Sequence, residues 1–234
     1  MRIRLRQIVL VAADLDAVER RIVDELGIEL CYRDPGVAEF GLRNALFPIG
    51  DKLLEVVSPT EAGTTAGRFL DKRGGDGGYM VIVETDDLGA ARARIAQARA
   101  RIVYEAKADG IVGLHVHPRD VGGAIVSVDV TDTWGEWPWA GPGWRDHVRT
   151  DRVTDVLTVE IEAFDPLDMA TRWSSVLGRP PEGACVVLDE GTLEFRRAGE
   201  RREGVAGFVL SPAAGADPVD TTIAGCRFRS AVAD

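Results

Sequence analysis

Two stretches of the chain decide its fold: residues 7–18 read QIVLVAADLDAV, and residues 80–91 read MVIVETDDLGAA. In each stretch a short apolar run, which suits a buried strand, leads directly into aspartates that suit the start of a helix. The first helix carries apolar residues at helical spacing and is expected to stop at Gly27. Three strand-like segments follow each helix, so both stretches are expected to open a βαβββ module.

The same order of elements is predicted three times. The first copy comprises a strand at 8–13, a helix from Asp14 to 26, and strands at 28–32, 37–42 and 52–57. The second comprises a strand at 79–85, a helix ending near 100, and strands at 102–105, 113–117 and 124–130. The third comprises a strand at 156–163, a helix to about 177, and strands near 185–188, 193–196 and 205–210. This order indicates an internal repeat, although the shorter third copy could be a separate α+β unit.

Composition narrows the class of protein. The chain has 234 residues, of which 45% are hydrophobic and 28% charged, as in soluble globular proteins of one or two domains. Its net charge of −10 argues against nucleic acid and anionic membranes as partners. Cys31, Cys185 and Cys226 are odd in number and form no CxxC pair, which favours reduced thiols and a cytoplasmic location. The first apolar run is too short for a membrane span and lacks a cleavage site, so no signal peptide is expected.

The repeated motifs, with LLEVVSP at 53–59 and LHVHPRDVGGAIVSVD at 114–129, resemble the vicinal oxygen chelate (VOC) superfamily. That superfamily contains glyoxalase I, methylmalonyl-CoA epimerase, extradiol dioxygenases, and bleomycin and fosfomycin resistance proteins. The similarity covers residues 3–131 well and 153–212 loosely. It is strongest to a glyoxalase-like branch, whose members often share a Trp/Pro-rich stretch like WGEWPWAGPGW at 134–144.

The resemblance implies an α+β fold in which tandem βαβββ modules form a cup-shaped mixed sheet with helices outside. We therefore expect paired modules at 1–73 and 74–131, a Trp/Pro-rich connector at 132–152, and a degenerate third module at 153–234. A third module has no partner within the chain. It is expected to pair with the third module of a second chain in a homodimer, or to cap the cup.

In the superfamily, metal ligands usually come from the first and last strands of each module. The matching positions here are Gln7, Glu55, Met80 and Ser127. Glu55 suits a divalent metal and Gln7 is acceptable, but a thioether is too soft and a serine hydroxyl is a weak ligand. A site without a metal cofactor is therefore favoured. If a divalent metal is present, Gln7, Glu55 and His117 are expected to bind it.

Glu55 has two interpretations. Its neighbours along the strand are apolar, so the carboxylate is expected to be shielded from water and to need a partner, for which Gln7 is the candidate. The pair could be structural. Alternatively, burial raises the pKa of Glu55 and makes it a catalytic base that Gln7 orients.

Other residues are candidates to contact a small-molecule ligand. His115 and His117 lie two residues apart, on one face of a strand, and could bind a metal ion together with Glu55, although the His-Pro before a turn favours a structural role. The clustered tryptophans could form a packing strap or a wall that stacks on a flat ligand. The predicted ligand-binding residues are Asn44, Phe47, Met80, His115, His117, Ser127 and Trp137.

The leading functional prediction is a glyoxalase-like lyase or isomerase that transfers a proton on a small molecule, with Glu55 as the base. The alternative is a non-catalytic protein that binds or sequesters a small molecule, similar to the bleomycin-resistance members. A pseudoenzyme that serves as an interaction module is a third hypothesis. The sequence does not separate them.

Overall fold

The computed structural model describes residues 1–199 and 202–232. The first predicted strand and helix are confirmed, because Asp14 accepts a hydrogen bond from the Ala17 amide and Gly27 ends the helix in the left-handed conformation. The elements of this first segment are β1 (Ile3–Val11), α1 (Leu15–Leu26), the 3-10 helix η1 (Pro35–Phe40), β2 (Leu42–Ile49), β3 (Lys52–Pro59) and α2 (Thr65–Arg73).

The predicted strands at 28–32 and 37–42 are wrong. Asp34 accepts a hydrogen bond from the Gly36 amide at 2.8 Å, and Pro35 is fixed in helical geometry, so the chain turns into η1. Tyr32 makes a single bridge to Leu46. The strand that pairs antiparallel with β3 is β2, which begins where the predicted strand was expected to end.

The second module forms as predicted. Its elements are β4 (Gly77–Thr85), α3 (Leu88–Gln97), β5 (Ile102–Ala108), β6 (Ile111–Val116), the short helix α4 (Pro118–Val121) and β7 (Ile125–Thr131). Asp87 caps α3 by accepting a hydrogen bond from the Ala90 amide at 2.8 Å. The last strand, β7, pairs parallel with β4, just as β3 pairs parallel with β1.

The remaining segment contains more strands than the sequence predicted. After two 3-10 turns, η2 (Pro138–Ala140) and η3 (Trp144–His147), the elements are β8 (Val153–Ala163), α5 (Pro166–Leu177), β9 (Pro181–Glu182), β10 (Cys185–Val187), β11 (Thr192–Arg197), β12 (Gly204–Pro212), β13 (Asp220–Ile223) and β14 (Cys226–Ser230). Residues 200–201 and 233–234 of the predicted third module lie outside the described residues.

Strand pairing shows where the third βαβββ module ends. β11 pairs parallel with β8, as β7 pairs with β4, so β9, β10 and β11 are the three strands that follow α5. β12, predicted as the last strand of this module, instead pairs parallel with β14, as β1 pairs with β3. β12, β13 and β14 therefore repeat the pairing of the first module without an intervening helix.

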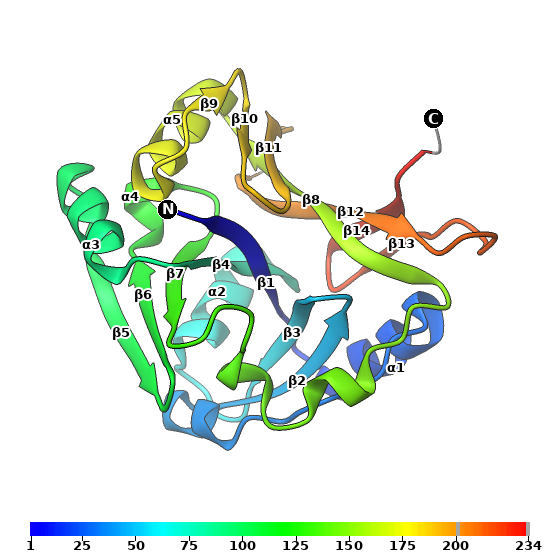
Figure 1. The fold of residues 1–234 in the computed structure, drawn as a ribbon. Helices are drawn as coiled ribbons and strands as arrows, with labels where there is room; N and C mark the ends of the chain where they lie inside the picture. Colours follow the sequence, from blue (N-terminus) through cyan, green and yellow to red (C-terminus); the bar gives the residue numbers. More distant parts are fainter. Residues whose placement is uncertain (200–201, 233–234) are drawn as a thin grey trace. The chain divides into compact units, whose positions relative to one another are not determined.

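The fold is α+β, with tandem βαβββ modules, as the sequence predicted. In the described part of the chain the strands form two seven-stranded mixed sheets. Their orders are β2-β3-β1-β4-β7-β6-β5 and β13-β14-β12-β8-β11-β10-β9, which match strand for strand (Figure 1).

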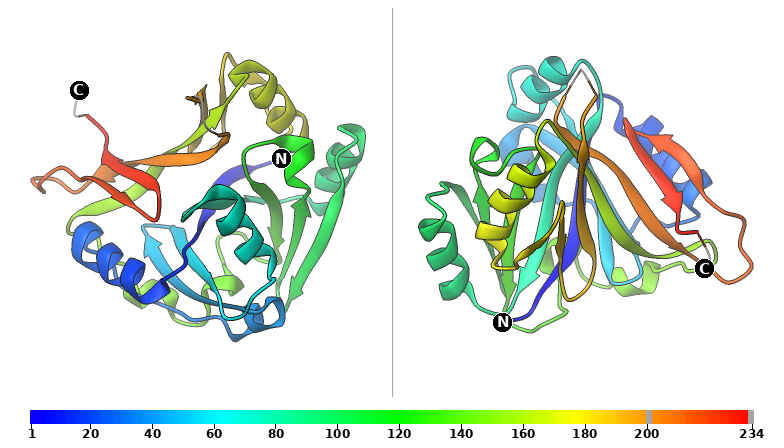
Figure 2. Two further views of the ribbon diagram at one scale, coloured as in Figure 1. Left: turned by 180° about the vertical axis from the view of Figure 1, so that it is seen from behind. Right: turned by 90° about the horizontal axis from the view of Figure 1, so that it is seen from above.

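The chain divides into two compact units. The first comprises Met1–Arg6, Met80–Pro138 and Leu157–Ala206. In its core the Trp173 ring of α5 meets Phe195 of β11 edge-on at 5.6 Å, and the Trp173 indole N–H donates to the Gly122 carbonyl. Figures 1 and 2 show α5 lying along β9, β10 and β11.

The second unit comprises Gln7–Tyr79, Trp139–Val156 and Gly207–Asp234. The buried face of α1 presents Leu15, Val18, Ile22 and Leu26, the apolar positions that define the predicted helix. Within the same unit, the Phe208 and Phe228 rings pack at 4.9 Å between neighbouring strands. No helix in the described ranges has both the length and the apolar character needed to cross a membrane.

Candidate functional site

A buried carboxylate held by two amides lies in the second unit. β1 and β3 run parallel with Val9 opposite Glu55, and β2 pairs on the other side of β3 with Leu46 opposite Glu55. Gln7 and Asn44 lie two residues before these partners, so their side chains share a face with Glu55. Gln7 Nε2 donates to Oε2 of Glu55 at 2.8 Å, and Asn44 Nδ2 donates to Oε1 at 2.7 Å.

The protein environment moves the Glu55 titration into the neutral range. Burial, which leaves the residue 8% exposed, is the main cause that raises the pKa of Glu55 to about 7. The hydrogen bond from Asn44 opposes this rise, the charge of Asp34 adds to it, and the bond from Gln7 opposes it. A carboxyl group with this pKa can both take and return a proton near neutral pH.

The orientation of the Asn44 amide is set by its second partner. Asn44 Oδ1 accepts a hydrogen bond from the backbone N–H of Asp34 at 2.9 Å, so the amide nitrogen must face Glu55. The Arg33 guanidinium donates a hydrogen bond to the backbone carbonyl of Asn44 at 3.2 Å. Asn44 was predicted as a ligand-binding residue, and the structure brings its side chain onto the Glu55 carboxylate.

Phe47, another predicted ligand-binding residue, lies elsewhere. It pairs with Leu54 and not with Glu55, so it occupies the opposite face of β2, and its side chain is 0% exposed. We therefore leave Phe47 out of the proposed site.

A second group of polar residues lies in the first unit, on β6 and β7. His115 is directly opposite Ser127, and Gly113 is directly opposite Asp129, so His115, Ser127 and Asp129 share one face. The Ser127 hydroxyl donates a hydrogen bond to Asp129, and both residues are buried. Asp129 was missed by the sequence analysis, although its position two residues after Ser127 on a predicted strand was the available signal.

The two histidines of the motif at 114–129 have different roles. Burial lowers the pKa of His115 to about 4, so its ring is neutral at physiological pH, and it packs against Tyr104 with centroids 5.4 Å apart. His117 lies past the end of β6 at the start of α4, where Nδ1 accepts a hydrogen bond from the Arg119 amide at 3.0 Å. The geometry of His117 is that of a structural turn.

The other two predicted ligand-binding residues also belong to the first unit. Met80 is half-buried in β4 and pairs with Ile125, two residues before the partner of Ser127. Trp137 is 1% exposed, and the Arg6 guanidinium lies over its ring at 5.1 Å. Burial of Trp137 favours the packing strap over a ligand-stacking wall for this tryptophan.

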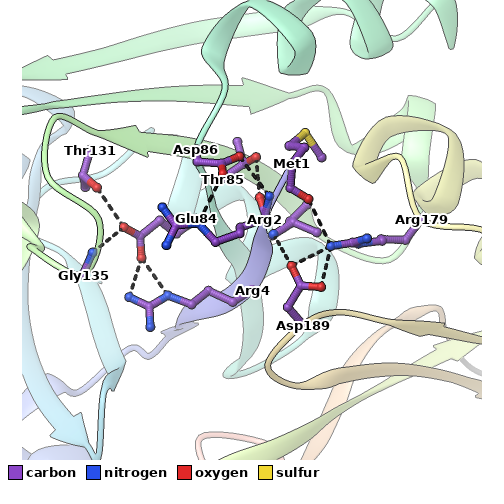
Figure 3. Close-up of polar contacts among 11 residues, drawn as sticks. Met1, Arg2, Arg4, Glu84, Thr85, Asp86, Thr131, Gly135, Arg179 and Asp189 are labelled. Carbon is purple, nitrogen blue, oxygen red and sulfur yellow. Dashed lines mark hydrogen bonds and ion pairs between the residues drawn. The ribbon is translucent and has the colours of Figure 1, made fainter.

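An ionic cluster that the sequence analysis missed surrounds Glu84 in the first unit (Figure 3). Arg4 donates to the fully buried Glu84 carboxylate from Nε at 2.8 Å, and Arg6 Nε lies 3.5 Å from it. Thr131 Oγ1 and the Gly135 amide donate to its other oxygen. The signal in the sequence is Arg-Leu-Arg inside an apolar strand, since buried arginines need a buried counter-charge.

The family positions for metal ligands do not provide a set of donors suited to a divalent metal. Both oxygens of Glu55 already accept amide N–H groups, the Ser127 hydroxyl donates to Asp129, and Met80 offers a thioether. Among the residues that the structure describes, no three His, Cys, Asp or Glu side chains gather where they could hold a metal ion. We therefore derive no reaction step through a metal.

Known proteins are similar to this chain in sequence and in fold. A family model described as Glyoxalase-like domain matches residues 8–177. The chain is 25% identical over 130 residues to the ethylmalonyl-CoA/methylmalonyl-CoA epimerase of Cereibacter sphaeroides, an alignment that covers 54% of this chain and 96% of the epimerase. Methylmalonyl-CoA epimerase from Bos taurus is 25% identical over 129 residues, covering 54% of this chain and 73% of that protein.

Two solved structures extend the comparison. A methylmalonyl-CoA epimerase in complex with methylmalonyl-CoA and NH4+ has a TM-score of 0.51 and 25% identity, covering 57% of this chain and 97% of that one. A hypothetical protein from Staphylococcus aureus has the same fold over 99% of both chains, with a TM-score of 0.74 and 13% identity. Since the family model spans more than half of its residues, the chain belongs to the glyoxalase-like domain family of the VOC superfamily.

Proposed function

We propose that this protein is an isomerase that transfers a proton on a small carbonyl compound, with Glu55 as the base and Gln7 as the residue that orients it. The observation that carries the proposal is a buried carboxylate whose pKa is raised to about 7 and whose two oxygens are each held by an amide. Catalytic bases work best when their pKa lies near the operating pH.

The reaction begins at a C–H bond next to a carbonyl group. Glu55 takes the proton, the C–H bond breaks, and its electron pair moves toward the carbonyl oxygen to form an enolate. A proton then returns to the opposite face of the same carbon, which inverts its configuration, so that no atom is gained or lost overall. Similarity to epimerases supports an isomerase over a lyase, and it favours a thioester of a 2-substituted acid as the substrate class.

The two amides help the proton to return. Gln7 and Asn44 each present an N–H group to a carboxylate oxygen, so they stabilise ionised Glu55. When Glu55 takes a proton, its O–H oxygen faces a donor and one of these hydrogen bonds weakens. Burial favours the protonated form and the amides favour the ionised form, which keeps the two states close in free energy.

The test is hydrogen exchange at the substrate carbon. We would incubate the protein in D2O with methylmalonyl-CoA and other 2-substituted acyl thioesters and follow deuterium uptake by mass spectrometry. Glu55→Gln should abolish the uptake while the ligand still binds, and Gln7→Ala should slow it. Glu61→Gln, which changes an exposed carboxylate, serves as the matched control.

Unchanged exchange in Glu55→Gln would reject Glu55 as the base. Tryptophan fluorescence that is quenched by a ligand recovered without deuterium would instead support the binding-protein alternative.

A further inference from the structure

The ends of the two sheets differ in how they are protected. β2 is covered by chain, because the Cys31 amide donates to the Leu46 carbonyl and the Leu46 amide donates to the Tyr32 carbonyl. β9 is only two residues long, so it offers little edge for pairing. β13 is covered by α1, from which Arg21 donates a hydrogen bond to the Thr221 hydroxyl. β5 is seven residues long and ends its sheet, with β6 as its strand neighbour in the described part of the chain.

The β5 strand exposes large apolar side chains, which is unusual for a strand at the edge of a sheet. Val103 is 51% exposed and Tyr104 is 39% exposed, and the Lys107 side chain is 65% exposed. A long edge strand with exposed apolar side chains is a template for pairing with another strand. Folded proteins protect such an edge with proline, with charged side chains or by covering it; residues 102–108 contain no proline, and the exposed charge on this edge is that of Lys107.

The hairpin geometry shows which backbone groups β5 offers. Ala108 and Ile111 close a two-residue turn, so the backbone groups of Ala108 and Ala106 point toward β6. The groups of Glu105 and Lys107 then point away from the sheet. An antiparallel partner strand must place residues whose backbone N–H and C=O groups also point outward directly opposite Glu105 and Lys107.

Charge decides the register of that partner. Glu105 and Lys107 lie on one side of the strand. One oxygen of Glu105 is 2.9 Å from Nζ of Lys107, and the other is 2.6 Å from Nη2 of Arg92 in α3. Two copies of β5 that pair about Ala106 place Glu105 opposite Lys107 of the other copy, twice. The neighbouring registers with the same backbone geometry place Glu105 opposite Glu105 or Lys107 opposite Lys107, which like charges disfavour.

From this self-complementary pattern we infer that β5 is the dimer interface of this protein, joining two copies through antiparallel β5–β5 pairing centred on Ala106. The occupant of the edge is a second copy because the charge pattern of the strand complements itself. The inference concerns assembly and does not depend on the proposed reaction.

Sedimentation velocity over a range of protein concentrations tests this interface. The unaltered protein should be a dimer, and Lys107→Glu should raise its dissociation constant by about tenfold or more, since two attractive cross-strand pairs become repulsive. The double variant Glu105→Lys/Lys107→Glu restores opposite charges and should restore the dimer. Lys72→Glu, which makes the same charge change at an exposed position of α2, should leave the dimer unaffected.

Thermal unfolding of each variant would show that it is folded, and amide hydrogen exchange would locate the interface. The amides of Glu105 and Lys107 should exchange more slowly in the dimer than after dilution. A monomer at all concentrations would overturn the inference, as would a dimer that Lys107→Glu leaves unchanged.

Discussion

The Asn44 side chain donates to Oε1 of Glu55 at 2.7 Å while its own oxygen accepts from the Asp34 amide at 2.9 Å. The second bond prevents the amide from flipping, so the donor always faces the carboxylate. This relationship makes Asn44 a positioning residue in the proposed site, whereas the sequence indicated a residue that contacts the ligand.

Asn44→Ala should therefore move the pH dependence of catalysis. Loss of a donor to the ionised form raises the pKa of Glu55 further, and the acidic limb of the kcat/KM profile should shift upward by about one pH unit. The profile with the active thioester measures the shift. Arg33→Ala removes a contact to the Asn44 backbone carbonyl and an ion pair with Glu19 but no donor to Glu55, so it is the control and should leave the limb in place. A profile unmoved by Asn44→Ala would contradict the positioning role.

The raised pKa of Glu55 also predicts how stability varies with pH. The folded protein holds this proton more tightly than the unfolded chain, whose carboxyl group has its ordinary pKa of 4.5. Stability contributed by Glu55 is thus present below about pH 4.5 and is lost as pH rises to about 7, a change of about 3 kcal/mol. Glu55→Gln cannot titrate and should lack this loss.

Urea unfolding at pH 5 and pH 8 measures the effect as the difference between the unaltered protein and Glu55→Gln. If that difference is the same at both pH values, the carboxyl group titrates outside this window.

Metal dependence gives a third prediction. Protein purified without an affinity tag should contain well under one equivalent of Zn, Ni, Mn or Fe per chain by elemental mass spectrometry. A chelator should leave both the melting temperature and the deuterium exchange unchanged, because neither proposed role of Glu55 and Gln7 uses a cation. About one bound equivalent, lost together with activity on chelation, would overturn this expectation.

The buried charge of Glu84 should be essential to stability. Its carboxylate neutralises Arg4 and lies close to Arg6, and none of the three side chains is more than 6% exposed. Glu84→Gln leaves two buried guanidinium groups without this counter-charge and should cost about 3–5 kcal/mol of unfolding free energy.

Chemical denaturation would measure that cost. Asp86→Asn is the matched control two residues along the chain, because Asp86 pairs with the exposed Arg2 and should change stability by less than about 1 kcal/mol. Equal effects of the two substitutions would show that Arg4 and Arg6 find other compensation.

The sequence by itself determined the modules that have clear local signals. Asp14, Asp87 and Asp165 each cap a helix after an apolar strand, and capping and apolar periodicity are properties of neighbouring residues. The same reasoning failed at residues 28–42, where apolar residues suggested strands. In that segment Asp34 and Pro35 start the 3-10 helix η1, so the two predicted strands do not form.

Tertiary structure alone decided which strands pair and which buried polar groups meet. The local sequence of β12 is that of an apolar strand, which suits the last strand of the third module as well as the first strand of the segment that follows. Only its parallel pairing with β14 shows that it belongs to the segment that follows. Glu55 and Gln7 were predictable as partners because the family resemblance fixes their positions. The contact of Asn44 with Glu55 and the partners of Glu84 were not, since a buried polar side chain is satisfied by whichever donor the fold brings close, and these donors lie 11 to 80 residues away along the chain.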